Sequence, residues 1–261
     1  MQLEILTLSK TGGRSVNEDA CGIWSSEHAC FCVLSDGAGG HGGGDVASKL
    51  VVQHALDWFR AHPDRGSEAV ATAMACANRS VIEQQTRDSR LGDMRATAVL
   101  LAIDTRRDIA YWGHLGDSRL YCFRRHRIVA QTRDHSVVQS MVDAGYLKAQ
   151  DLRSAPERSK LLAALGDEDN FEPNIETQEF SLRDGDVFLL CTDGFWEYLE
   201  EVEMEDMLAA SGSYKEWLKS LEDRVIARGS ASQDNYSAVV VACSDLSEIT
   251  ITKRADNVFQ Q

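Results

Sequence analysis

A glycine-rich stretch between two regular patterns constrains this chain more than any other feature. The apolar run 29–34 is typical of a buried strand, and a helical pattern of apolar residues begins near Asp45. Between them, six of the eight residues from 37 to 44 are glycine, directly after Asp36. Glycine loses more backbone freedom on folding than any other residue, so neither helices nor strands favour this composition. We therefore expect a loop in which a charged group approaches the main chain.

Two kinds of charged group could occupy this loop. The spacing Gly37-x-Gly39-x-x-Gly42 after a strand matches the fingerprint of dinucleotide-binding loops, which bind phosphate. Asp36 would repel a pyrophosphate, however, and Asp57, the candidate ribose ligand, falls inside a helical pattern. An aspartate beside a free carbonyl instead suits a hard divalent cation with oxygen ligands. The remainder of the chain has to decide between the two.

Composition and charge exclude several classes of protein. The 261 residues carry a formal net charge of −14, which argues against a nucleic-acid ligand and an anionic membrane surface. No apolar stretch has the length of a membrane span, and the first residues do not resemble a signal peptide. The seven cysteines are odd in number and mostly lie in apolar runs, so we expect reduced core residues of a cytoplasmic protein.

The order of predicted elements favours one mixed domain over residues 1–245, followed by a tail at 246–261. Strands are predicted at 3–8, 20–24, 29–34, 96–103, 109–115, 120–123, 128–130, 180–182, 187–191, 236–243 and 249–252. Helices are predicted from 45 to before Pro63, and at 69–82, 137–142, 195–199, 203–210 and 214–228. The short turns between 96 and 130 indicate an antiparallel meander. Residues 146–174 are charged and irregular.

Acidic residues recur in one context, at an end of a predicted strand beside glycine or a small polar residue. They are Asp36, Asp117, Asp193 and Asp234, and Glu18 and Asp19 precede a strand in the same way. Each alone would most often be a turn residue. Strands of one sheet can bring such ends together, where two carboxylates about 4 Å apart repel by roughly 4 kcal/mol at an effective dielectric near 20. The acids therefore either stay apart as turns or converge on metal.

Convergence would predict a hydrolytic centre with oxygen ligands. Oxygen ligands without a His/Cys cluster favour Mg²⁺ or Mn²⁺ over zinc. Two such ions about 3.5–4 Å apart lower the pKa of a bridging water towards about 7 and hold the attacking oxygen. Arg14 is then the cation placed to bind a phosphate through two of its guanidinium nitrogens.

Six short motifs follow one another along the chain. They are Arg14-x-x-Asn17-Glu18-Asp19, Ser35-Asp36-Gly37-x-Gly39-Gly40-His41, Gly116-Asp117-Ser118-Arg119, Thr132-x-Asp134-His135-Ser136, Cys191-Thr192-Asp193-Gly194 and Gln233-Asp234-Asn235. In this order they resemble the motifs of the metal-dependent (PPM, protein phosphatase 2C type) serine/threonine phosphatases, and the chain looks like their compact bacterial branch. Each motif alone is weak, but six in order across residues 3–243 are highly specific.

The resemblance implies an α+β fold with a metal centre at one edge. The expected architecture is a four-layer α-β-β-α sandwich of two antiparallel sheets flanked by helices. By position, Asp36, Asp193 and Asp234 would bind a first Mg²⁺ or Mn²⁺ ion. Asp36 and the carbonyl of Gly37 would bind a second.

Further roles follow from the same resemblance. Glu18 or Asp19 would support the second ion directly or through water. Asp117 and Asp193 would bind a third, weaker ion, and Arg14 would bind the substrate phosphate.

The implied reaction is hydrolysis of phosphoserine and phosphothreonine in proteins. A hydroxide bridging two ions would attack phosphorus in line without a phosphoenzyme, so the cysteines have no catalytic role. The implied partners are phosphoproteins, including a cognate serine/threonine kinase that the enzyme opposes. A monomer in the bacterial cytoplasm is expected, without nucleic-acid or membrane partners.

Some positions depart from the family pattern. Eukaryotic members carry a histidine directly after the Asp-Gly pair, where this chain, like bacterial relatives, has another residue, Ala38. His41 and His135 are more readily explained as structural residues than as proton donors. Glu197 stands where some relatives have an aspartate that supports the third metal, which weakens the case for that ion.

Two other functions compete with the enzyme. A metal-binding pseudophosphatase would bind phosphoproteins without turnover, but every expected ligand position here keeps its acid. The third hypothesis is the dinucleotide-binding oxidoreductase considered above. Residues 146–174 fall where the family has a variable flap beside the active site, from which Arg158 could contact substrate.

Overall fold

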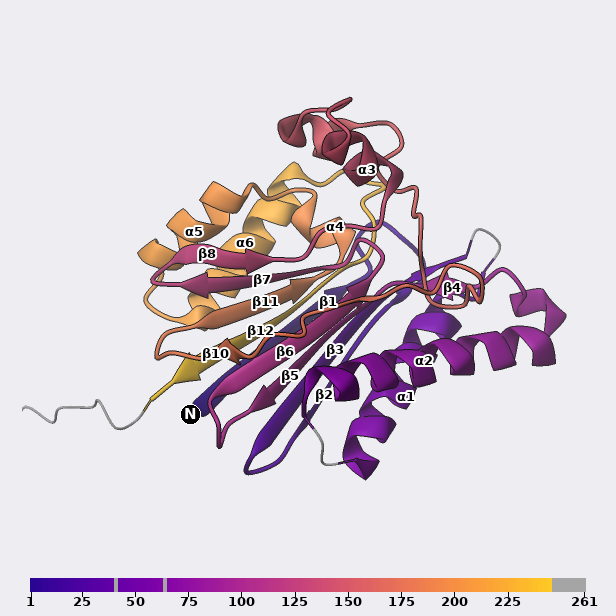
Figure 1. Cartoon of the computed structure of the whole chain (residues 1–261). Helices are drawn as coiled ribbons and strands as arrows, with labels where there is room; N and C mark the ends of the chain where they lie inside the picture. The colour runs from indigo at the N-terminus through magenta and orange to yellow at the C-terminus, as the bar shows by residue number, and fades with distance from the viewer. Residues whose placement is uncertain (40–41, 63–64, 246–261) are drawn as a thin grey trace, which may run out of the picture.

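Two antiparallel sheets form the centre of this computed structural model, which describes residues 1–39, 42–62 and 65–245 (Figure 1). The five-stranded sheet has the order β1–β12–β11–β7–β8. It comprises β1 (Gln2–Lys10), β12 (Tyr236–Ser244), β11 (Val187–Cys191), β7 (Arg119–Arg124) and β8 (Arg127–Gln131). The seven-stranded sheet has the order β10–β6–β5–β3–β2, with β4 pairing to β3 and β9 to β6. It comprises β2 (Asp19–Ser25), β3 (Ala29–Ala38), β4 (Arg95–Ala96), β5 (Ala98–Asp104), β6 (Ile109–Leu115), β9 (Asn174–Ile175) and β10 (Phe180–Ser181).

Helices cover both outer faces of this sandwich, as Figure 1 shows. α1 (Gly44–Ala61) and α2 (Ser67–Arg87) pack on the seven-stranded sheet through apolar residues at helical spacing. α4 (Asp193–Trp196), α5 (Glu201–Ala210) and α6 (Tyr214–Arg228) pack on the other sheet. A third apolar cluster fills the space between the sheets. Strands buried on both faces need continuous apolar sequences, which explains the long apolar runs. The predicted four-layer sandwich is confirmed.

The predicted meander between 96 and 130 is wrong in one respect. β6 pairs with β5 in one sheet, whereas β7 pairs with β8 and β11 in the other. The chain therefore crosses between the sheets at residues 116–118. Gly116 has φ +99°, and a Cβ atom there would lie 2.6 Å from Cγ2 of Thr97, so the crossing requires glycine. A turn signal in the sequence does not say which sheet receives the next strand.

Two other predicted boundaries also change. The single strand predicted at 96–103 is divided at Thr97 into β4 and β5. β3 continues through Asp36 to Ala38, so its last residues belong to the sheet and the glycine-rich loop begins later than predicted. The predicted strand at 249–252, the tail and His41 lie outside the described residues.

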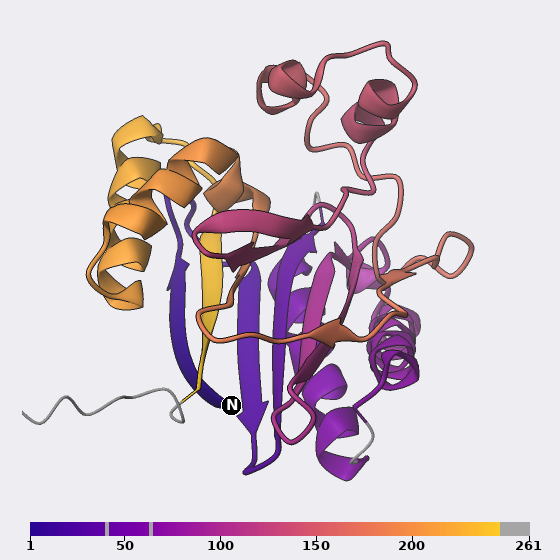
Figure 2. The same cartoon turned by 60° about the vertical axis from the view of Figure 1, so that its left-hand side comes forward.

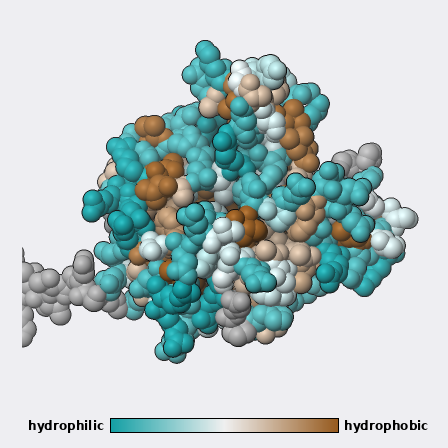
Figure 3. Space-filling model, viewed as in Figure 1, coloured by the Kyte–Doolittle hydropathy of each residue, from teal (hydrophilic) through white to brown (hydrophobic). Residues whose placement is uncertain are grey.

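The segment from α3 (Val137–Asp143) to residue 154 stands beyond the ends of the strands in Figures 1 and 2, and the chain then returns to the sheet, where Leu165 pairs with Ala96. It includes the 3₁₀ helix η2 (Ala149–Ser154), and another 3₁₀ helix, η1 (Ser89–Leu91), follows α2. Figure 3 shows that hydrophilic residues cover most of the face viewed, with hydrophobic residues in small separate patches. None of the helices among the described residues combines the length and apolar character that a bilayer crossing requires.

Candidate metal centre

The pair of strands β2 and β3 places two of the predicted acids opposite each other. Asp19 and Asp36 are direct cross-strand partners. The backbone N–H of Gly37 donates to the carbonyl of Glu18 at 3.0 Å. A Cβ atom on Gly37 would lie 2.0 Å from the carbonyl oxygen of Gly44, where α1 begins. Close packing of backbone on backbone therefore explains why this position is glycine.

The second sheet contributes acids at the same edge. Asp193 follows β11 as the first residue of α4, and Asp234 lies two residues before β12. The two sheets are tied together here by Thr192, whose hydroxyl donates to Oδ2 of Asp19 at 3.0 Å and accepts from the backbone N–H of Ser237 at 3.0 Å. Acids from strands far apart in sequence therefore meet at one end of the sandwich.

Burial and mutual repulsion raise the pKa values of these acids. Desolvation, followed by the charges of Asp19, Asp193 and Asp117, holds the pKa of Asp36 well above its usual range. Desolvation also raises the pKa of Asp19 to about 7. The pKa values of Asp117 and Asp193 are raised first by desolvation and then by a neighbouring aspartate. The charge of Asp193 is among the causes that raise the pKa of Asp36, so these two acids from opposite sheets lie within electrostatic range of each other.

The chemistry of these groups fits divalent cations. The donors are oxygen atoms, and Oδ1 of Asp19 is buried without a hydrogen-bond partner. Within residues 1–39, 42–62 and 65–245, no three His, Cys, Asp or Glu side chains already stand as a closed ligand set. The carboxylates would therefore have to close around ions, and bound cations would remove the repulsion that raises their pKa values.

Asp234 lies at the exposed rim of this cluster. Nη2 of Arg14 donates to Oδ2 of Asp234 at 2.8 Å, and both side chains are about half exposed. The neighbouring Asn235 fixes the loop that carries Arg14: its amide donates to the carbonyls of Thr11 (2.8 Å) and Val16 (3.0 Å). The Asn235 side-chain oxygen accepts from the N–H of Glu18 at 2.7 Å.

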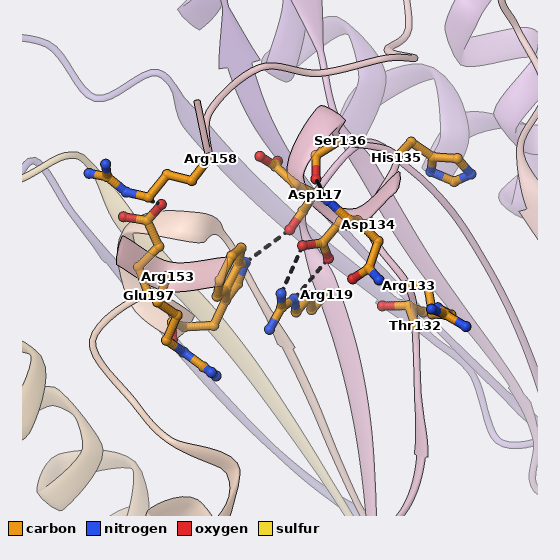
Figure 4. A network of polar contacts seen from close by, with 12 residues as sticks. Asp117, Arg119, Thr132, Arg133, Asp134, His135, Ser136, Arg153, Arg158 and Glu197 are labelled. Atoms are coloured by element: carbon orange, nitrogen blue, oxygen red, sulfur yellow. Dashed lines mark hydrogen bonds and ion pairs between the residues drawn. The ribbon is translucent and has the colours of Figure 1, made fainter. Parts of the chain in front are cut away.

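A buried ionic network supports Asp117 at the crossing between the sheets (Figure 4). The indole N–H of Trp196 donates to the backbone carbonyl of Asp117 at 2.9 Å. The guanidinium carbon of Arg119 lies 3.4 Å from the centre of the Trp196 ring. Arg119 in turn donates to both carboxylate oxygens of Asp134 at 2.8 Å. The turn that carries Asp117 is therefore held by side chains from both halves of the chain.

The segment predicted to act as a flap is tied to the same region by two arginines. Arg158 forms an ion pair with Glu197 at 2.9 Å, and Figure 4 shows the two side chains facing each other. Desolvation, followed by the charge of Asp193, raises the pKa of Glu197 to about 7. Arg153 donates to Glu201 at 2.8 Å and to the carbonyl of Trp196 at 3.3 Å. Arg158 thus lies within electrostatic range of Asp193, and its contact with substrate stays a prediction.

Sequence reasoning did not find the supporting residues. It noted Arg119 and Asp134 in separate motifs without pairing them, and it assigned no role to Trp196, Thr192 or Asn235. The one signal that could have paired Arg119 with Asp134 was their opposite charge. A charged side chain in an apolar surrounding needs a partner of opposite charge.

Two histidines pack beside the crossing. The rings of His114 and His135 lie 4.8 Å apart, and the backbone N–H of His135 donates to the carbonyl of Gly116 at 2.9 Å. Nε2 of His114 donates to the carbonyl of Arg133 at 2.7 Å. These contacts agree with the structural role predicted for His135. Desolvation lowers the pKa of His114 to about 4.

The buried His114 should make stability depend on pH. The unfolded chain takes up a proton near the ordinary histidine pKa of about 6.5, but the folded protein resists it until about pH 4. The free energy of unfolding should therefore fall as pH drops through this window, by about 2 kcal/mol from this group between pH 7.5 and 5. Urea unfolding of wild type and His114→Gln at both pH values measures the difference. Equal pH dependence in the two proteins would contradict the prediction.

Comparisons with known proteins agree with this architecture. A family model described as Protein phosphatase 2C matches residues 9–235. The serine/threonine phosphatase stp of Listeria monocytogenes (strain F2365) is 28% identical over 236 residues, covering 87% of this chain and 90% of that protein. The crystal structure of the Mycobacterium tuberculosis serine/threonine phosphatase PstP/Ppp superposes with a TM-score of 0.81 at 28% identity, covering 93% of this chain and 99% of that one.

A related structure holds metal. The catalytic domain of the serine/threonine protein phosphatase PstP in complex with two manganese ions matches with a TM-score of 0.77 at 28% identity, covering 93% of this chain and 99% of that one. The family model spans most of the chain, and the relatives share its sandwich of sheets and helices. This chain therefore belongs to the protein phosphatase 2C family and is a protein serine/threonine phosphatase.

Proposed function

We propose that the enzyme hydrolyses phosphoserine and phosphothreonine at a centre of two divalent ions, Mg²⁺ or Mn²⁺, at the acidic edge of the sandwich. The observation that carries the proposal is the meeting of acids from both sheets: Asp36 pairs with Asp19, and Thr192, which directly precedes Asp193, donates to Asp19. Asp36, Asp193 and Asp234 would hold the first ion. Asp36 and the Gly37 carbonyl would hold the second.

The other acids have supporting parts in this proposal. Asp19, whose Oδ1 is buried without a partner, would complete the second site, and Glu18 would act there directly or through water. Asp117 with Asp193 would hold a third, weaker ion. When bound, the ions would supply an activated bridging hydroxide as nucleophile and neutralise charge on the phosphate.

The protein's own groups bind and orient the substrate. Arg14 would release Asp234 and bind the substrate phosphate, since both side chains are exposed and a guanidinium matches phosphate geometry. No thiol takes part. Cys191 precedes the centre but is buried, and desolvation keeps its pKa far above the ordinary range, so no thiolate forms near neutral pH. All proposed ligands come from one chain, which supports a monomeric enzyme.

We further propose that the enzyme opposes a serine/threonine kinase in a bacterial cytoplasm. The support is indirect. A phosphoprotein phosphatase requires a kinase to make its substrate, and all seven cysteines are free, five of them buried, which suits a reducing compartment.

Turnover of a phosphothreonine peptide tests the proposed function. Phosphate release should require Mn²⁺ or Mg²⁺, stop with excess chelator, and return when metal is added back. A peptide captured in the presence of Mn²⁺ without phosphate release would instead favour the pseudophosphatase. Binding of NAD without metal would favour the oxidoreductase.

Metal should also stabilise the fold. An ion at about 100 times its Kd adds roughly 2.7 kcal/mol to the free energy of unfolding. Thermal unfolding with Mn²⁺ and with chelator measures this difference. An unchanged melting temperature would contradict a grouped acidic centre.

A further inference from the structure

Arg95 is a cation that forms no ion pair among the described residues, at the edge of the candidate metal centre. Arg14, Arg119 and Arg158 near the centre each form an ion pair. In the described part of the chain, Arg95 has no carboxylate within 4.0 Å and donates only through Nη1, to the carbonyls of Met94 (3.0 Å) and Gly92 (3.4 Å). Its Nε and Nη2 groups are left without a described acceptor. In a chain of net charge −14, this arrangement favours an external anion.

Arg95 lies on the same face of the sheet as the proposed metal ligand Asp36. Arg95 in β4 is the cross-strand partner of Ala38 in β3, so their side chains share one face of the sheet. Asp36 lies two residues before Ala38 and shares that face, since side chains alternate along a strand. Two residues of a strand span about 7 Å. The side chain of Arg95 therefore leaves the sheet opposite Ala38, about one strand repeat along β3 from Asp36, a proposed metal ligand.

A cavity opens at this position. It has a volume of about 260 Å³ and is lined by Ala38, Arg95 and residues from 159 to 167 of the flap segment. Leucine and alanine side chains form most of that lining. Apolar groups lower the local dielectric constant, so the charge of Arg95 is screened less by solvent there. The cavity joins the glycine-rich strand end to the flap segment.

Asp167 is the one carboxylate among the lining residues, and its oxygens are engaged by its own turn. They accept from the backbone N–H of Asp169 (3.1 Å) and from the N–H (3.3 Å) and side-chain amide (3.0 Å) of Asn170. These donors satisfy the oxygens of Asp167 locally. The charge of Arg95 also helps to lower the pKa of Asp167, but the two side chains form no ion pair, so Nε and Nη2 of Arg95 remain available.

We propose that Arg95 binds the carboxylate of an aspartate or glutamate next to the phosphorylated residue of the substrate. An extended peptide advances about 3.3–3.6 Å per residue, so a side chain one or two positions from the phosphoresidue reaches this cavity. Arg95 is then a specificity-determining residue for acidic phosphopeptides. The inference rests on the proposed function.

Matched phosphothreonine peptides test whether Arg95 binds an acidic residue of the substrate. One set carries glutamate, and the other glutamine, at single positions one and two residues to either side of the phosphothreonine. Wild type should prefer the glutamate peptide at the position that Arg95 contacts, and Arg95→Ala should lower kcat/KM for that peptide about tenfold, through KM, as expected for loss of a charge-assisted hydrogen bond. Hydrolysis of the glutamine peptides should not change. Arg95→Glu should reverse the preference towards a lysine peptide.

Controls separate this role from others. Arg79→Ala on the exposed face of α2 removes an arginine with no described partner and should leave every rate unchanged. Arg95→Gln keeps a donor for the Met94 carbonyl and should lose the glutamate preference while unfolding at the wild-type temperature. If Arg95→Ala lowered kcat/KM by a similar factor for every peptide and for p-nitrophenyl phosphate, the inference would be overturned. Arg95 would then act on the phosphoryl group or on folding.

The failure of this inference differs from the failure of the proposed function. If wild type hydrolyses p-nitrophenyl phosphate with Mn²⁺ but does not distinguish glutamate from glutamine, only the role of Arg95 is wrong. If wild type hydrolyses neither p-nitrophenyl phosphate nor any peptide with metal, both fail.

Discussion

Replacing Asp36 or Asp193 by asparagine should lower kcat about 10³-fold or more and, at the same time, stabilise the metal-free protein. Activity falls because the proposed ions lose a shared ligand and with it the electrostatic stabilisation of the transition state. Stability rises because each carboxylate is buried beside others that raise its pKa, so at neutral pH the folded state bears a cost that the unfolded chain does not. Removing one charge should add roughly 1–3 kcal/mol to the free energy of unfolding.

Two measurements check the expected loss of activity and gain of stability. Phosphopeptide turnover with saturating Mn²⁺ measures kcat, and urea unfolding in chelator measures the free energy of unfolding of the metal-free protein. Asp57→Asn is the matched control, since Asp57 lies in α1 and pairs with the exposed Arg60. Variants that retain turnover would refute the proposed ligands. Variants that lose turnover and are also less stable without metal would point to a purely structural role.

Replacing Arg119 by methionine should destabilise the protein by about 3–5 kcal/mol. Arg119 and Asp134 are both almost completely buried, with side-chain exposures of 4% and 2%, and Asp134 accepts two hydrogen bonds from the arginine. Losing one partner leaves a buried charge without compensation. The Trp196 ring also loses the guanidinium stacked on it. Chemical denaturation of the purified variant measures the loss.

The double variant Arg119→Met with Asp134→Leu separates charge from packing. It removes both ions together, so much of the lost stability should return. The free energy of unfolding lost in the double variant is compared with the sum of the losses in Arg119→Met and Asp134→Leu. If the two are equal, the ion pair itself does not explain the effect. A comparison with Arg60→Met, which removes an exposed ion pair of α1, should show a change below about 1 kcal/mol.

The fold and the enzyme class could be predicted because their signals are local. Apolar runs and turn residues located most strands and helices, and the six ordered motifs identified the family. The grouping of the acids was also predicted, and the structure brings Asp19, Asp36, Asp117 and Asp193 within electrostatic contact. Their parts in binding metal stay predictions.

Other features depend on contacts that no local pattern records. Nothing near Gly116 indicates that the next strand enters the other sheet, because that choice is made by β11, some 70 residues further on. Trp196 resembled an ordinary core residue of a short helix, yet its N–H holds the carbonyl of Asp117. Arg95 was assigned no role from the sequence, and only the pairing with Ala38 places it near the acidic edge of the sheet.

The bond between Thr192 and Asp19 has a mechanical consequence. It joins the two sheets at the same end where the acids meet, so the geometry of the proposed metal centre depends on the contact between the sheets and not on either sheet alone. A small shear of one sheet past the other would separate Asp36 from Asp193 while every strand kept its ladder. Hydrostatic pressure, or distortion of the sandwich by a bound partner, should therefore abolish phosphatase activity well before it unfolds the protein.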